Sequence, residues 1–320
     1  MKNSLSTFYD EKVVVVTGGS GFIGSALINK LQKYNCKIIR TCRGALNPLD
    51  GVQDKILNLT KKESWVEIMS TADIIFHLAG NTSLAFAEEN IDDSLLSNLL
   101  PIANLVYACK KLKRSPRVVF ASTVTVYGMT DFNPVTEEVV PRPVSVYDLH
   151  KLFAEQHLTM ANNQGFFNAK SLRLANVYGS SLSGSGLKDR GILSKITQAC
   201  MQGNNINVYG GGDYLRDYIY IDDVVDAFLY VCISDSPDTV INVASGVGTT
   251  LKEVFQMISG EVEKSKGIRC NLKDVDWPEN INIIEKRNFM VSNDKLKSIS
   301  GWKANTSLKK GIQRLVKHHS

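Results

Sequence analysis

Buried, β-branched stretches alternate with helix-like stretches along the first half of the chain. Helix-like spacing of apolar positions recurs at 26–31, 63–70 and 94–112. The stretches that predict buried strands lie at 13–16, 36–42, 54–59, 72–80, 116–123 and 169–177. This β-α-β alternation predicts a Rossmann-type α/β fold with a doubly wound parallel sheet. In such a sheet the crossovers are right-handed, and a ligand binds at the carboxyl ends of the strands.

The pattern changes after residue 178. A loop of small residues, 179–191, would suit an active-site cover, and shorter elements follow it. Helices are expected near 191–202, 222–233, 250–259 and 306–318. We therefore expect residues 1–178 to form a dinucleotide-binding domain that also carries the catalytic residues. Residues 179–320 should form mainly a smaller α/β substrate-binding lobe, from which some strands and helices return to the first domain.

Composition narrows the class of protein. The 320 residues are 43% hydrophobic, which suits one large or two modest domains with a substantial core. The formal net charge of +5 is mild, so it fits an anionic small ligand and disfavours nucleic acid as a partner. The six cysteines form no C-x-x-C pair and are interpreted as small core residues, and no metal site is predicted. The chain shows no signal peptide and no apolar run near the roughly 20 residues that span a bilayer, which predicts a cytoplasmic protein without a membrane partner.

The first predicted strand runs directly into a glycine cluster. Gly18, Gly21 and Gly24 follow the four valines with the spacing G-x-x-G-x-x-G, and a helix-like stretch begins at once. The first glycine permits a tight turn, the second lets the backbone approach a ligand, and the third lets the helix pack on the strand. The free N–H groups and the dipole at the helix start attract an anion. This order predicts a site for the diphosphate of a dinucleotide; an ordinary strand-to-helix turn is the alternative.

A second pattern suggests acid/base chemistry. The segment "YDLHK" places Tyr147 and Lys151 four residues apart, on one face of a predicted helix. An ammonium group beside a phenol would lower the pKa of the phenol, making Tyr147 a candidate general acid/base. The preceding strand ends with two hydroxyl groups, Ser122 and Thr123, which could bind a substrate oxygen at the same sheet edge. The alternatives are a plain surface helix and local backbone capping.

With these motifs in order, the chain resembles the extended short-chain dehydrogenase/reductases, in particular the NAD-dependent epimerase/dehydratase family of nucleotide-sugar enzymes. The resemblance covers nearly the whole chain. It is carried by "TGGSGFIG" (17–24), "FHLAG" (76–80), "STVTVYG" (122–128), "YDLHK" (147–151), "LRLANVYG" (172–179), "INVYGGGDYLRDYIYIDDV" (206–224), "INVASG" (241–246) and "GWKANTSLKKGI" (301–312).

The resemblance implies a role for each matching residue. Thr123, Tyr147 and Lys151 would form the catalytic set, Lys151 would also hold the nicotinamide ribose, and Asn98 would brace this site. The residues implied to bind the cofactor are Gly18, Ser20, Gly21, Phe22, Ile23, Gly24, Arg40, Arg43, Asn58, Leu59, Leu78, Ala79, Gly80, Asn98, Ser122, Tyr147 and Lys151.

The resemblance also implies a nucleoside-diphosphate-sugar substrate and a homodimer. Arg216 would grip the diphosphate through two parallel hydrogen bonds. The residues implied to bind substrate are Thr123, Asn176, Arg190, Val208, Arg216 and Arg287, although Arg190 and Arg287 are equally well interpreted as surface charges. Asp222 and Asp223 are interpreted as helix N-cap residues. The homodimer would pack the helices at 94–112 and 145–162 into a four-helix bundle.

Two positions depart from the family pattern. Val124 stands where dehydratases and decarboxylases of the family carry an acid, which disfavours loss of water. The second predicted strand ends in "IIRTCRG", with Arg40 and Arg43 and no acidic residue. Two guanidinium groups there would bind a ribose phosphate, so the pattern favours NADP over NAD. The alternative is that Arg43 merely stacks on adenine.

Two enzymatic functions are supported almost equally by these observations, with the epimerase first. In a nucleoside-diphosphate-sugar 4-epimerase, Tyr147 would remove a hydroxyl proton, hydride would pass to the nicotinamide, and hydride would return to the other face of the keto sugar. In an NADPH-dependent 4-keto-sugar nucleotide reductase, the ketone would be reduced once. A non-catalytic nucleotide-binding protein is the minor third interpretation, against which the intact Thr123, Tyr147 and Lys151 argue.

Overall fold

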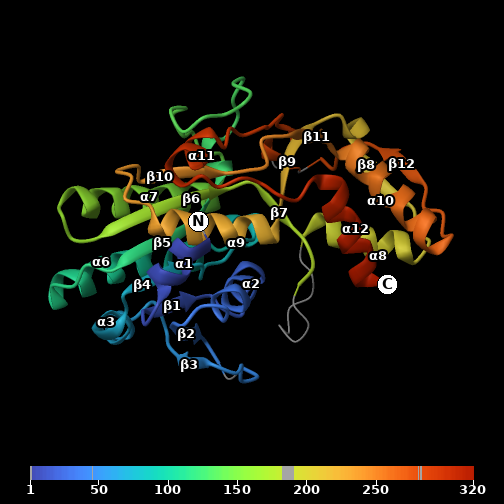
Figure 1. Ribbon diagram of the computed structural model, residues 1–320. Helices are drawn as coiled ribbons and strands as arrows, with labels where there is room; N and C mark the ends of the chain where they lie inside the picture. The colour runs from blue at the N-terminus through green and yellow to red at the C-terminus, as the bar shows by residue number, and fades with distance from the viewer. Residues whose placement is uncertain (1, 45, 182–190, 280, 282) are drawn as a thin grey trace.

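A seven-stranded parallel sheet forms the larger part of the computed structural model, which describes residues 2–44, 46–181, 191–279, 281 and 283–320 (Figure 1). The strand order is β10-β6-β5-β4-β1-β2-β3. The bounds are β1 Val13–Thr17, β2 Lys37–Cys42, β3 Val52–Ile56, β4 Ile74–His77, β5 Arg117–Thr123, β6 Asn168–Leu174 and β10 Val240–Val243. All neighbouring strands of this sheet are parallel, which confirms the predicted doubly wound α/β fold.

Two hydrophobic cores lie on the two faces of this sheet. Val14 and Val16 of β1 pack into one core and Val15 packs into the other, because successive strand residues point to opposite faces. The first face is covered by α1 (Lys2–Tyr9), α2 (Phe22–Leu31) and α9 (Ile221–Ile233). The second face is covered by α3 (Lys62–Thr71), α6 (Leu100–Leu112) and α7 (Val146–Asn163). The sheet is therefore buried on both sides, as its valine-rich strands require.

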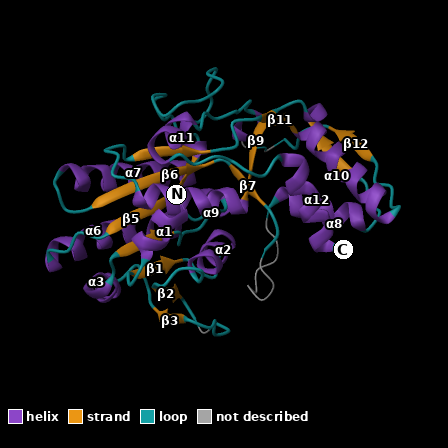
Figure 2. Cartoon of the chain, viewed as in Figure 1, coloured by secondary structure: helices purple, strands orange, loops and turns teal. Residues whose placement is uncertain are grey.

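The smaller lobe lies beside the carboxyl edge of the large sheet (Figure 2). Its three-stranded sheet has the order β11-β9-β7, and β12 pairs with β8 in a two-stranded sheet. The bounds of these elements are β7 Asn176–Tyr178, β8 Ile206–Tyr209, β9 Leu215–Tyr220, β11 Gly248–Thr250, β12 Leu272–Val275, α8 Ile192–Met201, α10 Leu251–Lys266 and α12 Leu308–His319. The remaining elements are α4 Leu84–Glu89, α5 Ile91–Asn98, α11 Asp294–Ser300 and the 3-10 turns η1 Val124–Tyr127, η2 Gly210–Gly212 and η3 Ile283–Lys286. Within the second half of the chain, α9 and β10 return to the large sheet.

Several element boundaries differ from the sequence prediction, each for a local reason. The helix expected at 94–112 is two helices, α5 and α6, because Pro101 has no N–H with which to continue the first helix into the second. The strand expected at 169–177 divides into β6 and β7, which belong to different sheets. Helix α10 runs past residue 259 because a capping box at Thr250 starts it and Gly267 ends it.

The interpretation of Asp222 and Asp223 as N-caps is wrong. The N-cap of α9 is Tyr220, and both aspartates lie in the first turn. The buried carboxylate of Asp223 accepts hydrogen bonds from the backbone N–H groups of Asn305 and Thr306 at 2.9 and 3.0 Å. Asp223 therefore fastens the C-terminal segment to α9.

All six cysteines are free thiols in the structure, and five of them are buried. No helix in the described ranges combines the length and the apolar character needed to cross a membrane. The expected active-site cover, 179–191, falls mostly on residues 182–190, which lie outside the described part of the chain.

Candidate active site

The predicted cofactor and catalytic segments end at the same edge of the large sheet. Strand β4 pairs with β1 on one side and with β5 on the other, all in parallel. The glycine loop follows β1, residues 78–80 follow β4, and Ser122 and Thr123 close β5. The fold therefore brings these three segments together at the carboxyl edge.

The glycine loop makes the tight turn that its spacing predicts. The N–H of Gly21 donates to the carbonyl of Gly18 at 2.8 Å, and Gly18 has a φ of +66°. A Cβ at Gly18 would lie 2.7 Å from the backbone nitrogen of Ala79, so only glycine fits between the loop and the end of β4. Gly21 is the N-cap of α2 and makes no side-chain cap, which leaves the first N–H groups of α2 for an anion. Ser20, Phe22, Ile23 and Gly24 line this turn or begin the helix.

Thr17 and His77 hold the loop after β4 in place, and neither was singled out from the sequence. Thr17 Oγ1 lies 2.7 Å from His77 Nδ1 and accepts from the backbone N–H groups of Leu78 and Ala79 at 3.2 and 3.3 Å. His77 stacks on Phe120 of β5. Burial lowers the pKa of His77 to about 3, so this imidazole is neutral and structural. The available signal was their place in adjacent strands, with Thr17 directly before Gly18 and His77 directly before Leu78.

The backbone of Gly80 lies close to the side chains of Asn98 and Lys151. A Cβ at Gly80 would be 2.6 Å from Asn98 Oδ1 and 3.5 Å from Lys151 Nζ. Asn98 Oδ1 is buried and has no hydrogen-bond partner among the described residues. Lys151 Nζ donates to the carbonyl of Ala121 at 2.9 Å. A buried acceptor without a donor, next to an ammonium group, fits a ligand that brings hydroxyl groups, such as a ribose.

Tyr147 and Lys151 lie one turn apart on α7, as predicted, but their electrostatics differ from the prediction. Lys151 Nζ is 5.9 Å from the ring centre of Tyr147 and points toward Ala121. Burial lowers the pKa of Lys151 to about 8. Burial, together with Asp148, raises the pKa of Tyr147, and Lys151 is not among the causes of the shift, so the expected lowering is wrong.

Ser122 and Thr123 point to opposite sides of β5, which corrects the expectation that both hydroxyl groups serve one site. Ser122 Oγ donates to Glu155, whose carboxylate is paired with Arg173 at 2.7 Å. The Arg173 guanidinium lies over the ring of Tyr127 at 4.6 Å. Ser122 is therefore part of a buried structural network behind the strand.

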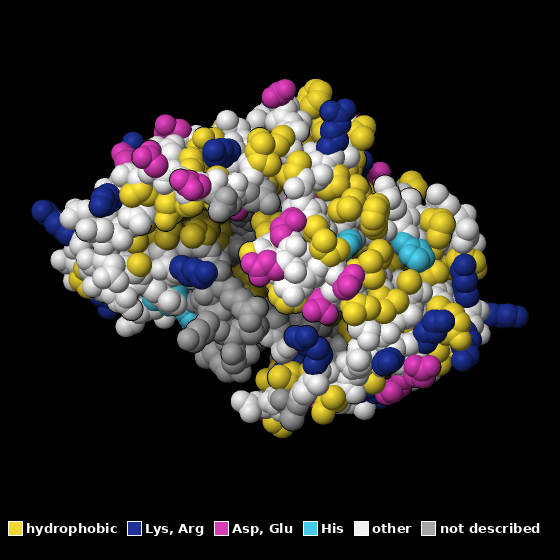
Figure 3. Space-filling model, turned by 180° about the vertical axis from the view of Figure 1, so that it is seen from behind, with side chains coloured by type: hydrophobic (Ala, Val, Ile, Leu, Met, Phe, Trp, Pro, Cys, Tyr) yellow, Lys and Arg dark blue, Asp and Glu magenta, His cyan; other side chains and the backbone are white. Residues whose placement is uncertain are grey.

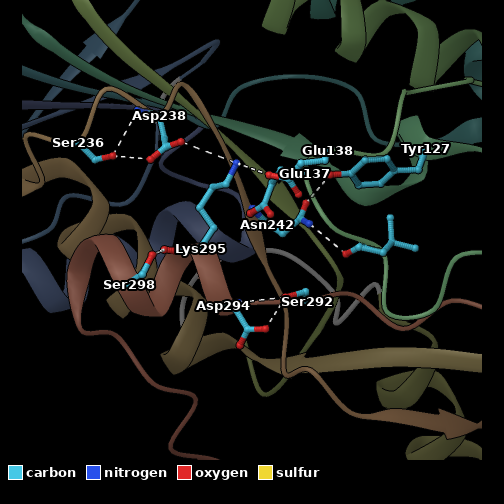
Figure 4. Close-up of polar contacts among 11 residues, drawn as sticks. Tyr127, Glu137, Glu138, Ser236, Asp238, Asn242, Ser292, Asp294, Lys295 and Ser298 are labelled. Atoms are coloured by element: carbon cyan, nitrogen blue, oxygen red, sulfur yellow. Dashed lines mark hydrogen bonds and ion pairs between the residues drawn. The ribbon is translucent and has the colours of Figure 1, made fainter.

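Tyr127 continues this network to the edge strand of the sheet. Its hydroxyl group donates to Asn242 Oδ1 at 2.8 Å, and the Asn242 N–H donates to Glu137 at 2.8 Å. Figure 4 shows how Lys295 of α11 reaches both Glu138 and Asp238 in the same region. The Tyr127 contact fastens η1, which follows the active-site threonine, to β10, and the Lys295 contacts fasten α11 to the segments that carry Glu138 and Asp238.

Thr123 points into a different network. Thr123 Oγ1 lies 2.7 Å from Thr125 Oγ1, and Thr125 donates to the buried carboxylate of Asp148. Ser145, the N-cap of α7, donates to the other Asp148 oxygen at 2.7 Å. Asp148 and Thr125 were not among the residues predicted for the site. Their signal was an acid beside Tyr147 and a second hydroxyl group two residues after Thr123.

Arg40 lies beside the glycine loop, but its charge is already paired. Its guanidinium donates to both carboxylate oxygens of Asp54 at 2.6 and 2.7 Å and to the carbonyl of Asn47 at 2.9 Å. Asp54 faces Arg40 from β3, which the sequence alone could not show. The segment at the end of β2 contains no acid of its own, but β3 supplies one across the sheet. Arg43 is exposed.

Asn58 and Leu59, which were predicted to bind the cofactor, lie just after β3. Asn58 is exposed, and its Oδ1 accepts hydrogen bonds from the N–H and hydroxyl groups of Thr60 at 3.0 and 2.8 Å. The carbonyl of Leu59 accepts from Trp65 Nε1 at 2.9 Å. These bonds hold the backbone of this loop and leave the Leu59 side chain half-buried.

The predicted substrate residues come from the other lobe. Buried Arg216 donates to the carbonyls of Arg287 and of Glu285, the latter at 2.5 Å, and its nearest carboxylate is Glu285 at 3.9 Å. Arg287 is buried as well, and its Nε has no partner in the described part of the chain. Burial and the neighbouring Arg216 lower the pKa of Arg287 to about 10. Two buried guanidinium groups, neither with a carboxylate within hydrogen-bonding distance among the described residues, suit an anion chemically.

The other three predicted substrate residues differ in their surroundings. Asn176 Nδ2 donates to the carbonyl of Asp217 at 2.9 Å, beside Arg216 on β9. Val208 is buried and packs against Gly212. Arg190 lies outside the described residues.

Comparisons with known proteins agree on one family. A family model, the NAD-dependent epimerase/dehydratase family, matches residues 14–250. The chain is 25% identical to UDP-glucose 4-epimerase of Mycolicibacterium smegmatis, with 94% of this chain and 96% of that protein covered. It is 26% identical to dTDP-4-dehydro-6-deoxyglucose reductase of Escherichia coli, with 95% and 96% covered. The crystal structure of Thermus thermophilus UDP-glucose 4-epimerase in complex with NAD superposes with a TM-score of 0.82, at 25% identity and with 96% and 98% covered.

Proposed function

From the premise that the chain belongs to the NAD-dependent epimerase/dehydratase family, we propose that it is a nucleoside-diphosphate-sugar 4-epimerase. The observation that carries this proposal is the pairing of two sites across the lobes. One is the Thr123, Tyr147 and Lys151 set at the edge of the large sheet, and the other is the pair of buried arginines, Arg216 and Arg287. The first suits a sugar carbinol and the second suits a diphosphate.

The residues divide the work as follows. Arg216 and Arg287 bind the substrate diphosphate and so fix the sugar by its remote end, which orients the reacting carbon. Tyr147 takes the proton of the 4-hydroxyl group and later returns it, and Thr123 binds the same oxygen. Asn98 and Lys151 would hold a ribose of the cofactor. The glycine loop, Asn98 and Lys151 would hold a nicotinamide dinucleotide, which would supply a hydride acceptor and donor. The buried Val124 leaves no acid beside Thr123 to assist loss of water, which supports epimerisation over dehydration.

For the cofactor we propose a nicotinamide dinucleotide, and specifically NAD. The ion pair between Arg40 and Asp54 supports NAD, because a paired guanidinium offers little charge to a ribose phosphate and Asp54 would repel one. An enzyme that returns its hydride also needs no exchange of cofactor. The exposed Arg43 supports the alternative, an NADPH-dependent 4-keto-sugar nucleotide reductase, as does the likeness to the Escherichia coli reductase.

The purified protein tests this choice directly. Its retained dinucleotide is identified by mass spectrometry, and the protein is then mixed with pooled UDP-, dTDP-, GDP- and CDP-sugars. Retained NAD and interconversion of C4 epimers without net change in reduced nicotinamide would support the epimerase. Stoichiometric use of NADPH with keto sugars alone would favour the reductase. A Tyr147→Phe variant that keeps the dinucleotide but loses conversion controls for contaminating enzymes.

We also propose a homodimer formed by α6 and α7. Large apolar side chains are exposed on these helices, and Figure 3 shows hydrophobic side chains gathered on the half of the molecule that carries them. Phe153 and Met160 of α7 are 43% and 47% exposed, and Tyr107 of α6 is 37% exposed. Light scattering should give twice the mass of the 35.4 kDa chain, and Phe153→Glu should give a monomer.

A further inference from the structure

Two buried thiol groups meet at the outer end of the smaller lobe, where Figure 1 shows α8, α10, β8 and β12 lying away from the large sheet. Cys200 Sγ is 2.6 Å from Cys270 Sγ, although the two residues are 70 positions apart in the chain. This separation is only about half an ångström longer than a disulfide bond, whose length is about 2.05 Å. In the described part of the chain no other two thiol groups lie within hydrogen-bonding distance of each other.

The two thiol groups come from separate elements that only the tertiary fold brings together. Cys200 lies in the last turn of α8 and is 0% exposed. Cys270 lies between the end of α10 and β12, is 6% exposed, and has exposed neighbours in Arg269 and Asn271. The Ser259 hydroxyl group of α10 donates to the carbonyl of Cys270 at 2.7 Å and holds this segment in place. Cys270 is therefore the member of the pair nearer to solvent.

We propose that Cys200 and Cys270 form a redox modification site, where a peroxide converts the two thiol groups into a disulfide bond between α8 and the segment before β12. The proposal goes beyond the proposed function and does not depend on it. The thiolate of Cys270, the more exposed sulfur, attacks a peroxide oxygen and becomes a sulfenic acid. Cys200 then attacks the sulfenic sulfur, which forms the S–S bond and releases water. The two thiol groups lose two electrons and two protons in all, and hydrogen peroxide takes them up to give two molecules of water.

Burial of the pair sets the speed of this reaction. Burial raises the pKa of the Cys200 thiol, and the neighbouring Cys270 raises it further. Because a protonated thiol is a poor nucleophile, the pair should oxidise more slowly than an exposed cysteine. The same cover shields the finished bond, since a reducing thiolate must reach one of its sulfur atoms. The site therefore suits slow and lasting oxidation.

A disulfide bond here would constrain the lobe that carries the predicted substrate residues. It would close a loop that contains β8 with Val208 and β9 with Arg216. A bond between residues 70 positions apart removes conformations from the unfolded chain, so the Tm of the oxidised protein should rise by about 5–10 °C. A hydrogen bond between two thiol groups would give no such rise.

The test uses the folded, fully reduced protein and hydrogen peroxide. After the peroxide is removed with catalase, free thiol groups are alkylated and the chain is digested without reduction for mass spectrometry. We expect one linked pair of peptides, joining Cys200 to Cys270, a mass loss of about 2 Da per chain for the two hydrogen atoms, and full reversal by dithiothreitol. The Tm is then measured with and without oxidation. Cys109→Ala, which removes a buried thiol of the large domain, is the matched control and should keep both the link and the rise in Tm.

The proposal fails if all six cysteines of the wild type can still be alkylated after a long exposure to peroxide, because the pair would then share a hydrogen bond alone. It also fails if the two cysteines are oxidised to sulfinic acids without a linked peptide. Cys200→Ala and Cys270→Ala should each abolish the link and the rise in Tm, and a rise that persists in either variant would contradict the assignment. If either variant does not fold, the peptide map and the Tm of the wild type and of Cys109→Ala still decide. None of these measurements requires turnover, so failure of the proposed function and failure of this proposal are distinguishable.

Discussion

Two pairs of buried charged side chains lie near the candidate active site. One pair joins opposite charges, Arg173 and Glu155, and the other consists of two arginines, Arg216 and Arg287. Arg173 is paired with Glu155 at 2.7 Å, with side chains 5% and 2% exposed. Arg216 lies close to Arg287, and its nearest carboxylate, Glu285, is 3.9 Å away and 44% exposed. The carboxylate raises the pKa of Arg173, whereas burial beside another arginine lowers the pKa of Arg287 to about 10. Arg173 has a carboxylate in direct contact, whereas Arg287 has none within hydrogen-bonding distance among the described residues, so we expect Arg173 to serve the fold and Arg287 to serve an anion.

The largest expected effect is a loss of stability when the pair of Glu155 and Arg173 is broken. Glu155→Ala would leave the Arg173 charge buried and unpaired, so the free energy of unfolding should fall by about 3–5 kcal/mol. Urea denaturation measures this change. The double variant Glu155→Met, Arg173→Met, which buries no charge, should recover most of the loss. A loss well below 1 kcal/mol in the single variant would contradict the structural role of the pair.

Removing the charge of Arg287 should have the opposite effect on stability. Arg287→Met removes a poorly compensated buried charge, so the free energy of unfolding should stay constant or rise. The same change should weaken binding of UDP by about ten- to a hundredfold, the size expected for charge-assisted hydrogen bonds to a phosphate group. Calorimetric titration with UDP gives Kd, and a surface variant, Arg269→Met, is the matched control. If UDP binding is unchanged and stability falls strongly, Arg287 stabilises the fold, as Arg173 does, and does not bind the diphosphate.

Lys151 offers a test between these extremes, since it is buried and its ammonium group donates to a backbone carbonyl, with no carboxylate hydrogen-bonded to it among the described residues. Its folded-state pKa is lowered to about 8, below the value of an unfolded lysine. Between the two pKa values the unfolded chain binds more protons, so the contribution of Lys151 to stability rises with pH through that window. The difference in free energy of unfolding between the wild type and Lys151→Met should therefore grow in favour of the wild type from pH 8 to about pH 10. A difference independent of pH would show that Lys151 is not desolvated.

The smallest expected effect concerns the cofactor. Asp54→Ala would free the guanidinium of Arg40, which is now held by two hydrogen bonds. Affinity for NADP relative to NAD should rise by about threefold to tenfold, because the pair is partly exposed and its charge is screened. Fluorescence titration of the cofactor-free protein with both dinucleotides gives the ratio. Asp50→Ala, on the exposed loop before β3, is the control. An unchanged ratio would show that Arg40 does not face the adenosine ribose.

The fold could be predicted from the sequence because its signals are local. Four valines before Gly18 specify a buried strand and a turn, and alternation of such units specifies the parallel sheet. Local patterns also placed Tyr147 and Lys151 one turn apart. The partners of these groups could not be predicted, since they come from distant segments. Asp54 reaches Arg40 through the pairing of β2 with β3, and Glu155 reaches Ser122 from the opposite face of β5. A helix pattern likewise shows spacing but not desolvation, which is why the pKa of Tyr147 was mispredicted.

The account depends most on whether the chain inverts a sugar at C4. The direct measurement is proton NMR of one purified UDP-, dTDP-, GDP- or CDP-sugar after another, incubated with the protein and no added NADPH. The account predicts that at least one of them yields a mixture with its C4 epimer, that the same mixture forms from either epimer, and that reduced nicotinamide does not accumulate. No epimer from any of them, with a 4-keto sugar consumed only when NADPH is supplied, would contradict it.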